Sequence, residues 1–281
     1  MIPKRLSDIE SLLIYVYFSI FYFKIKKRGF SWGQKNKKTS KSRLYIFGSG
    51  YSLNSISDMQ WRKIRNTGDT LSFNDFYYSK FIDLDYYIFR EVDSKHFKRL
   101  PRFLRVRLNS IFNISKIKSI HDLISGNSTM KQTKYLFLCD KKSGIALLYY
   151  MLFRSSINLF GFFSNPYDRT INWPISETPL NITHGAATLL DAINIGYIMG
   201  YTELVLCGVD LYDRNYFYLE KDETRDFDKN KGYTARDIHN TSHHIIETLS
   251  LWKPELYKRG VKVSVLNEKS LLNSVFDIYN L

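Results

Sequence analysis

A short apolar run leading into two closely spaced glycines decides the fold class: Leu44-Tyr45-Ile46-Phe47-Gly48-Ser49-Gly50-Tyr51-Ser52-Leu53. The run Leu44–Phe47 has the length and composition of a buried β-strand. Gly48 and Gly50 predict a tight turn into a helix, where free backbone N–H groups could approach a phosphate. The turn lacks the third glycine of the dinucleotide-binding pattern and the Gly-Lys ending of a P-loop, so an ordinary strand-to-helix turn remains an equal alternative.

The rest of the chain alternates between strand-like and helix-like stretches. Further strands are expected at Thr70–Phe73, Tyr86–Phe89, Tyr135–Cys139, Ile157–Phe162, Leu204–Val209 and Val261–Leu266. Helices are expected at Met59–Arg65, Phe97–Ile111, Gly144–Phe153, Ala186–Met199 and Thr241–Arg259, the last with a kink or break at Pro254. Strands separated by helices predict an α/β fold with a Rossmann-like, doubly wound, mostly parallel sheet over residues 43–281.

The composition is that of a globular protein with an uneven charge. Hydrophobic residues make up 44% of the chain and aromatic residues 16%. Residues 1–45 hold 11 Lys and Arg against Asp8 and Glu10, so nine of the 14 net positive charges fall in this segment. A fold that binds nucleic acid would carry the charge on the fold itself, so we expect no nucleic-acid partner. Cys139 and Cys207 are expected to be free thiols in a reducing compartment.

The amino-terminal segment is apolar and flanked by basic residues. Leu12–Phe23 is apolar or aromatic except for Ser19, but twelve residues are too few for a bilayer span, and no cleavage site follows. Residues 29–42 are polar, basic and typical of a linker. We therefore expect residues 1–42 to hold a cytoplasmic protein peripherally on the inner face of the membrane. A core helix and a true span are the alternatives, and a homo-oligomer stays open.

Polar residues follow several of the predicted strands. Asn74 ends the strand Thr70–Phe73, where it could contact a ribose or a base, although turn formation is the simpler explanation. Thr183-His184-Gly185 is expected to open the helix Ala186–Met199, and a helix amino terminus favours a phosphate or carboxylate. Asp210 follows the next strand, at the position that faces ligands in open α/β sheets.

A long segment without apolar periodicity, residues 212–238, is expected to form a lid. Tyr212, Tyr216 and Tyr218 lie in it and could donate hydroxyl groups to a phosphate. His239 follows the lid and could act as a general base, with a solvated loop histidine as the alternative. A metal site at His239 and His243 lacks an obvious third ligand.

In this order, the motifs resemble those of the bacterial sialyltransferases of glycosyltransferase family 42 and of related Rossmann-like nonulosonate transferases, a set that also includes an archaeal pterin diphosphokinase. The resemblance runs from about Leu44 to the carboxyl terminus. It is carried by the glycine turn, the strand-ending asparagine, the Gly-x-Asp motif with its tyrosine, the loop tyrosine, the histidine and the last motif: Gly48-Ser49-Gly50, Asn74, Gly208, Asp210, Tyr212, Tyr218, His239 and Leu266-Asn267-Glu268-Lys269-Ser270-Leu271-Leu272. The sequence departs from the family at Asn181, His184 and Arg90, where Arg, Ser and Asn are expected.

The resemblance implies a GT-A-like variant of the fold and an inverting transfer of an acidic sugar, a sialic acid or a related nonulosonate or Kdo-type sugar. The donor would be a CMP-sugar, and the acceptor a bacterial surface glycan or glycolipid such as lipooligosaccharide or capsule. His239 would be the base, and Tyr212 and Tyr218 would stabilise the departing phosphate. The donor would lie against Gly48, Ser49, Gly50, Asn74, Thr183, His184, Gly185, Asp210 and Ser270.

No cofactor and no metal site are required in this interpretation, although Mg²⁺ is not excluded. The rival interpretation is a Mg²⁺-dependent phosphotransferase of the pterin diphosphokinase type. It would need ATP and more carboxylates at the strand ends than Asp210 alone.

Overall fold

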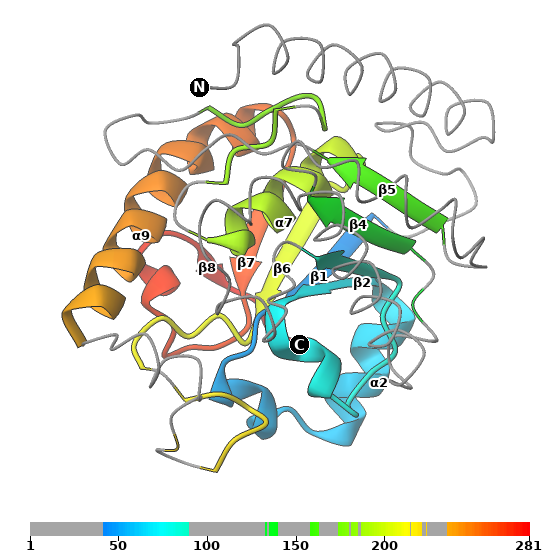
Figure 1. Cartoon of the computed structure of the whole chain (residues 1–281), viewed down its shortest axis with the longest axis vertical. Coiled ribbons are helices and arrows are strands. Elements are labelled where there is room, and N and C mark those ends of the chain that lie inside the picture. Colours follow the sequence, from blue (N-terminus) through cyan, green and yellow to red (C-terminus); the bar gives the residue numbers. More distant parts are fainter. Residues whose placement is uncertain are drawn as a thin grey trace, which may run out of the picture.

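The strand at Arg43–Phe47, β1, lies inside one parallel sheet (Figure 1). The computed structural model describes residues 42–89, 133, 135–139, 158–162, 174–179, 181–184, 187–213, 215–220, 223 and 235–281. Within these residues the sheet has eight strands in the order β5-β4-β3-β2-β1-β6-β7-β8, and every neighbouring pair is parallel. The other strands are β2 (Asp69–Phe73), β3 (Tyr86–Phe89), β4 (Tyr135–Cys139), β5 (Asn158–Phe162), β6 (Glu203–Cys207), β7 (Lys262–Val265) and β8 (Asp277–Ile278).

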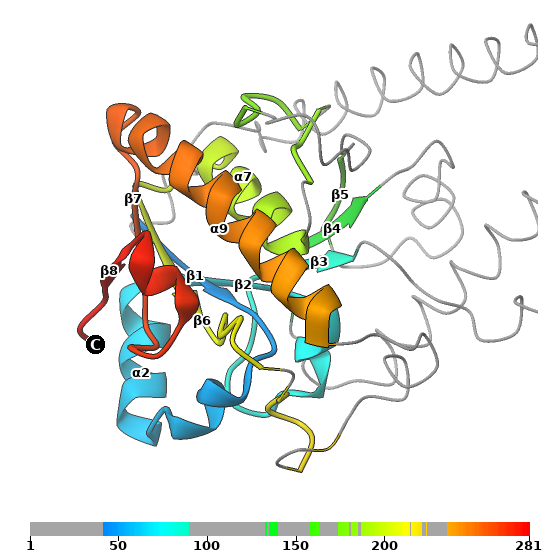
Figure 2. The ribbon, with the colours of Figure 1, turned by 90° about the vertical axis from the view of Figure 1, so that its left-hand side faces the viewer.

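Helices cover both faces of the sheet. Helix α2 (Asp58–Thr67) lies on one face, and α7 (Thr188–Ile198) and α9 (Ala235–Lys258) lie together on the other (Figure 2). Because successive side chains of a strand point to opposite faces, both faces of β1 must be apolar. Accordingly, Leu44 and Ile46 pack with α7 and α9, whereas Tyr45 and Phe47 pack with α2. The predicted doubly wound, mostly parallel α/β sheet is confirmed.

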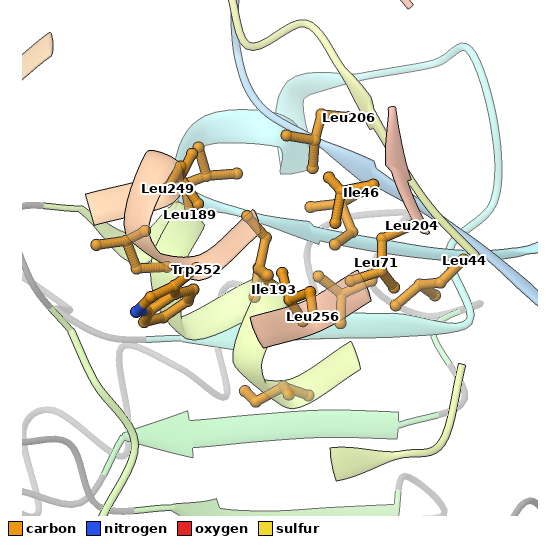
Figure 3. Close-up of a cluster of buried hydrophobic side chains, with 14 of the residues drawn as sticks. Leu44, Ile46, Leu71, Leu189, Ile193, Leu204, Leu206, Leu249, Trp252 and Leu256 are labelled. Atoms are coloured by element: carbon orange, nitrogen blue, oxygen red, sulfur yellow. The ribbon is translucent and has the colours of Figure 1, made fainter. Parts of the chain in front are cut away.

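The larger core lies between the sheet and the pair α7 and α9. Figure 3 shows Leu44, Ile46 and Leu71 from the sheet facing side chains from the two helices. The helical residues there include Leu189 and Ile193 of α7 and Leu249, Trp252 and Leu256 of α9. Most residues of α7 are buried, because this helix is covered by the sheet and by its neighbours.

The chain reverses its direction of travel across the sheet beside β1. From β1 it moves outward through β2 and β3 to β5, and it later returns to place β6 on the other side of β1. The gap between β1 and β6 is therefore the topological switch point, where open α/β sheets bind ligands beyond the carboxyl ends of the strands. Short 3₁₀ helices follow three strands near this edge: η1 (Tyr51–Ser55), η2 (Asn74–Tyr78) and η3 (Leu271–Ser274).

Several element boundaries differ from the predictions. β6 ends at Cys207 rather than Val209, because Gly208 takes a left-handed φ of 62° and turns the chain out of the sheet. α9 begins at Ala235, six residues earlier than expected, and continues through Pro254 without a break. β8 was not expected, since two residues are too few to show a strand pattern.

Some predictions fall outside the described residues. These are the amino-terminal helix and linker, the helices at Phe97–Ile111 and Gly144–Phe153, Arg90, Gly185 and most of the expected lid. Among the residues that the structure does describe, no helix is long and apolar enough to cross a membrane.

Candidate functional site at the switch point

The topology brings the sequence motifs to one edge of the sheet. The glycine turn follows β1, Asn74 follows β2, Asp210 follows β6, and Asn267 follows β7. Helices α7 and α9 precede β6 and β7, so their amino termini also lie at this carboxyl edge (Figure 2). Motifs separated by up to about two hundred residues therefore surround the gap between β1 and β6.

Three amide groups of the glycine turn, those of Gly48, Gly50 and Tyr51, form hydrogen bonds within the protein. The N–H of Gly48 donates to the carbonyl of Cys207 at 2.8 Å, and that of Gly50 donates to the carbonyl of Gly208 at 2.8 Å. The next N–H, of Tyr51, donates to the carbonyl of Asn215 at 3.1 Å. These groups fasten the β1 turn to the chain that leaves β6, so they are not the free phosphate donors that the sequence suggested.

Gly50 is required by close packing. A Cβ atom at this position would lie 2.4 Å from Oδ2 of Asp210 and 2.7 Å from the carbonyl oxygen of Gly208. Contacts under 3.0 Å are not tolerated without movement of the neighbour. The glycine therefore lets the β1 turn approach the Asp210 carboxylate, not a ligand, in this arrangement.

Asp210 joins three loops. Its carboxylate accepts the N–H of Ser52 at 3.0 Å and the Ser52 hydroxyl, both from the β1 turn. It also accepts Nδ2 of Asn267, from the loop after β7, at 2.7 Å. Asp210 is only 4% exposed, so its oxygens are largely committed to these donors. A buried carboxylate that accepts several hydrogen bonds holds the loops that supply the donors in fixed positions.

Tyr212 lies two residues after Asp210 and is partly exposed to solvent. Its side chain is 42% exposed, and its hydroxyl oxygen accepts Nδ2 of Asn267 at 3.4 Å. Partial burial, together with the nearby Asp210 carboxylate, raises the pKa of Tyr212, while the Asn267 hydrogen bond opposes this. A phenol with a raised pKa stays protonated at neutral pH and can donate a hydrogen bond.

Two further residues at this edge, Ser49 and Asn74, are candidates for ligand contacts. Ser49 is buried, and within the described residues its Oγ has no hydrogen-bond partner. A buried hydroxyl without a partner is costly, so it is a candidate ligand contact. Asn74 is exposed and has a left-handed φ of 56°, while its carbonyl accepts the buried hydroxyl of Tyr87.

The backbone is strained between Asp210 and Tyr212. Leu211 has a φ of 64°, which costs a residue with a branched side chain about 1–2 kcal/mol. Its carbonyl accepts the hydroxyl of Ser242 in α9 at 2.8 Å, and its side chain packs against the larger core. Strain of this kind persists only where the surroundings enforce it, and it is concentrated at functional sites.

Tyr218 has a different partner from the one expected. Its hydroxyl donates to Oδ2 of Asp75 at 2.7 Å, and its ring packs 4.9 Å from that of Tyr78. Tyr216 forms a bridge with Gly50, and Phe217 is buried. The first part of the expected lid is thus anchored on the domain, and its last four residues belong to α9.

The Thr183-His184 segment lies before α7 and does not open it, because the helix begins at Thr188. The Thr183 hydroxyl donates to the carbonyl of Pro174 at 2.6 Å. His184 Nδ1 lies 3.0 Å from Oδ2 of Asp191, a fully buried residue in the first turn of α7. Asn194 of α7 also contacts this segment, since its Oδ1 accepts the N–H of Thr183 at 3.5 Å as well as that of Ser176 at 3.0 Å. His184 therefore has a carboxylate partner of its own, and its contact with a ligand stays a prediction.

Ser270 serves the protein backbone. It is 4% exposed; its hydroxyl donates to the carbonyl of Val209 at 2.6 Å and accepts the N–H of Leu272 at 3.2 Å. These bonds cap η3 and hold it beside the β6 loop, and they leave the hydroxyl little capacity for a nucleotide. Asn267, in the same motif, is the residue that reaches Asp210 and Tyr212.

His239 lies inside α9, not before it. It falls within the first turns of the helix, at the carboxyl edge of the sheet. A role as base stays a prediction. Across the described part of the chain, no group of three or more His, Cys, Asp and Glu side chains could hold a metal ion.

Ser52 and Asn267 belong to the site but were not predicted from the sequence. Both lie inside quoted motifs, but serines and asparagines are common in turns, and nothing in the local sequence distinguishes these two. Their spacing from Asp210, 158 and 57 residues, conceals the contact.

No protein-family model matches the chain, and no curated protein matches it. Two solved structures are similar to it. The monofunctional α-2,3-sialyltransferase Cst-I from Campylobacter jejuni is 15% identical over 86% of this chain and 84% of that one, with a TM-score of 0.45. A variant of the sialyltransferase Cst-II in complex with CMP is 16% identical over 85% of this chain and 86% of that one, also with a TM-score of 0.45.

Proposed function

We propose that this protein is an inverting glycosyltransferase that moves an acidic sugar from a CMP-sugar donor to a surface glycan or glycolipid such as lipooligosaccharide or capsule. One observation carries the proposal: Asp210 ties the β1 turn and the β7 loop together at the switch point, with Tyr212 exposed beside them. The motif resemblance, which gives this tyrosine the departing phosphate as its partner, supplies the reaction class.

The proposed chemistry needs a hydrogen-bond donor for the leaving group and a base for the acceptor. Tyr212 supports the first role, since its exposed phenol is protonated at neutral pH and can donate to a phosphate oxygen on which negative charge develops. His239 is our candidate for the second role, removing the proton from the acceptor hydroxyl as it attacks the anomeric carbon. Ser49 and Asn74 are candidates for contacts to the nucleotide.

The donor class can be tested by product release. We expect CMP to be released from CMP-linked acidic sugars, by transfer or by slow hydrolysis, without turnover of UDP-sugars or of ATP with Mg²⁺. We also expect this release to continue in excess EDTA. Phosphoryl transfer from ATP, or no CMP release from any CMP-linked acidic sugar, would overturn the proposal.

The base is tested separately. His239→Ala should lower turnover by about 10²–10⁴-fold, the usual contribution of general base catalysis. His243→Ala on the same helix is the matched control, because its side chain is 58% exposed and lies 3.3 Å from Glu247. Full transfer activity in His239→Ala would exclude this assignment.

We also propose that residues 1–42 hold the enzyme peripherally on the cytoplasmic face of the membrane, where a lipid-linked acceptor would be found. The support is the apolar run flanked by basic residues. The full chain should sediment with vesicles containing anionic lipid and should be released by salt, whereas a chain without residues 1–30 should not sediment. Equal sedimentation of both chains would contradict this proposal.

A further inference from the structure

We propose that Asn267 is a positioning residue that directs the hydroxyl proton of Tyr212 outward, toward the phosphate of the ligand. The inference deepens the proposed function and rests on its assignment of Tyr212 to the phosphate. It starts from a chain of contacts that joins Ser52, Asp210, Asn267 and Tyr212.

The contacts of the side-chain oxygen and nitrogen of Asn267 define the orientation of its amide group. Its oxygen accepts the N–H of Lys269 at 3.0 Å, so the amide nitrogen must lie on the other side. An amide nitrogen carries two hydrogens. One is directed at Oδ1 of Asp210 at 2.7 Å, and the other faces the hydroxyl oxygen of Tyr212 at 3.4 Å.

This orientation decides what the Tyr212 hydroxyl can do. A phenol is both a donor and an acceptor. Because Asn267 is the donor in their contact, the hydroxyl hydrogen of Tyr212 must be donated elsewhere. Tyr212 is 42% exposed and its contact with Asn267 lies at the protein surface, so solvent or a ligand can accept this hydrogen. The 3.4 Å contact is long, as is common for functional hydrogen bonds before a ligand is bound.

Asp210 holds Asn267 in place. The carboxylate is anchored by the N–H and the hydroxyl of Ser52, so the amide meets an acceptor whose own position is set by the β1 turn. The Leu271 N–H also donates to the Asp210 carbonyl at 3.2 Å, which keeps the β7 loop beside the β6 loop. Preorganised donors of this kind avoid reorganisation when charge develops on a leaving group.

The hydrogen bond can be tested on the free protein. In the full chain labelled with ¹³C at tyrosine Cζ, the variant Tyr212→Phe identifies the Tyr212 signal. Asn267→Ala should shift this signal at neutral pH, because Tyr212 loses its donor. Glu268→Ala, an exposed neighbour in the same loop, should leave it unchanged. An unmoved Tyr212 signal in Asn267→Ala would overturn the proposal.

Binding tests whether the bond acts through Tyr212. In calorimetric titrations with CMP, Asn267→Ala should weaken binding by about three- to ten-fold, the net contribution of a neutral hydrogen bond. Tyr212→Phe should weaken binding at least as much, and the double variant should be no weaker than Tyr212→Phe alone. Independent effects that multiply in the double variant would overturn the positioning role.

A second variant protects the test against misfolding. Asn267→Leu keeps the approximate size and branching of the side chain but has no hydrogen-bond donor, so it should shift the same Tyr212 signal. An unchanged Tyr212 signal in this variant would also count against the proposal. If the wild-type protein does not bind CMP, the proposed function fails, but the Tyr212 signal still decides whether Asn267 donates to Tyr212.

Discussion

Two tyrosines contrast in their surroundings. Tyr201 lies at the amino ends of the strands, called here the amino edge of the sheet, and Tyr212 lies beyond their carboxyl ends, at the carboxyl edge. At the amino edge, the buried hydroxyl of Tyr201 donates to Asp69 at 2.6 Å and lies 3.1 Å from the hydroxyl of Tyr86. At the carboxyl edge, Tyr212 is 42% exposed, and its hydroxyl forms one long hydrogen bond within the described part of the chain, with Asn267. The first arrangement satisfies polar groups inside the protein, and the second leaves a donor available to a ligand.

Other residues follow the same division. At the amino edge, Arg43 and Glu203 form a 2.7 Å ion pair between the first residues of β1 and β6. At the carboxyl edge, Ser49 is buried with no partner among the described residues, and Leu211 has a left-handed backbone. We infer that the amino edge supplies stability while the carboxyl edge gives up some stability for binding.

The strongest disruption of the carboxyl edge should come from Gly50→Ala. The added methyl group would lie 2.4 Å from Oδ2 of Asp210, so the β1 turn must move away. We expect unfolding free energy to fall by about 1–3 kcal/mol and turnover of a CMP-sugar to fall by at least about 100-fold. Denaturant titration and CMP release measure the two effects.

Gly260→Ala is the matched control for this change. Gly260 has a φ of 76° but open space around its Cβ position, so the substitution adds only backbone strain of about 1–2 kcal/mol. It lies beyond α9, away from the switch point, and should keep full turnover. Wild-type turnover in Gly50→Ala would show that the close approach to Asp210 is not required.

At the amino edge, Tyr201→Phe should act on stability alone. It removes the buried donor of the Asp69 carboxylate, so we expect a loss of about 1–3 kcal/mol in unfolding free energy. Turnover per folded molecule should not change. Tyr257→Phe, whose side chain is 81% exposed, is the control for the loss of a hydroxyl. A large loss of turnover in folded Tyr201→Phe would break the division between the edges.

The buried thiol of Cys207 should make the free energy of unfolding decrease at alkaline pH. Burial raises the pKa of the Cys207 thiol. The thiol ionises above about pH 8.5 in the unfolded chain but stays protonated in the folded protein. The contribution of Cys207 to the free energy of unfolding is therefore fully present below that pH and is lost above it, by up to about 1.4 kcal/mol per pH unit. The free energy of unfolding, measured by denaturant titration at several pH values between 8 and 9.5, should therefore fall less steeply with pH in Cys207→Ala. An identical slope in both proteins would be inconsistent with a protonated buried thiol.

The smallest effects are expected at Asn74, where two substitutions distinguish backbone strain from a contact with the nucleotide. Asn74→Gly and Asn74→Ala both remove the side-chain amide, but only alanine resists the left-handed φ of 56°. If the amide contacts the nucleotide, both variants should raise KM for the donor by about three- to ten-fold. Alanine should in addition lower unfolding free energy by about 1 kcal/mol. An unchanged KM in Asn74→Gly would remove Asn74 from the site.

Periodic patterns predicted the elements more successfully than their ends. β3 and β4 have the predicted bounds, and β1, β2, β5 and β7 differ by one residue at one or both ends, because buried parallel strands are continuous apolar runs. The starts of α7 and α9 and the end of β6 were misplaced. Helix starts depend on caps, and α7 begins after Ala187, which supplies no side-chain cap. The end of β6 depends on the φ of Gly208.

The sequence by itself determined the α/β class, the glycine turn and the residue types available beside it, because hydrophobic periodicity and turn chemistry are local properties. Only the tertiary structure decided how those residues are used. It directed the Gly48 and Gly50 amides to backbone carbonyls, occupied the hydroxyls of Thr183, Ser270 and Tyr218, and placed Asn267 between Asp210 and Tyr212. The physical reason is that a hydrogen-bonding group is committed or free according to neighbours that lie far away in the chain and meet it only when the sheet has formed.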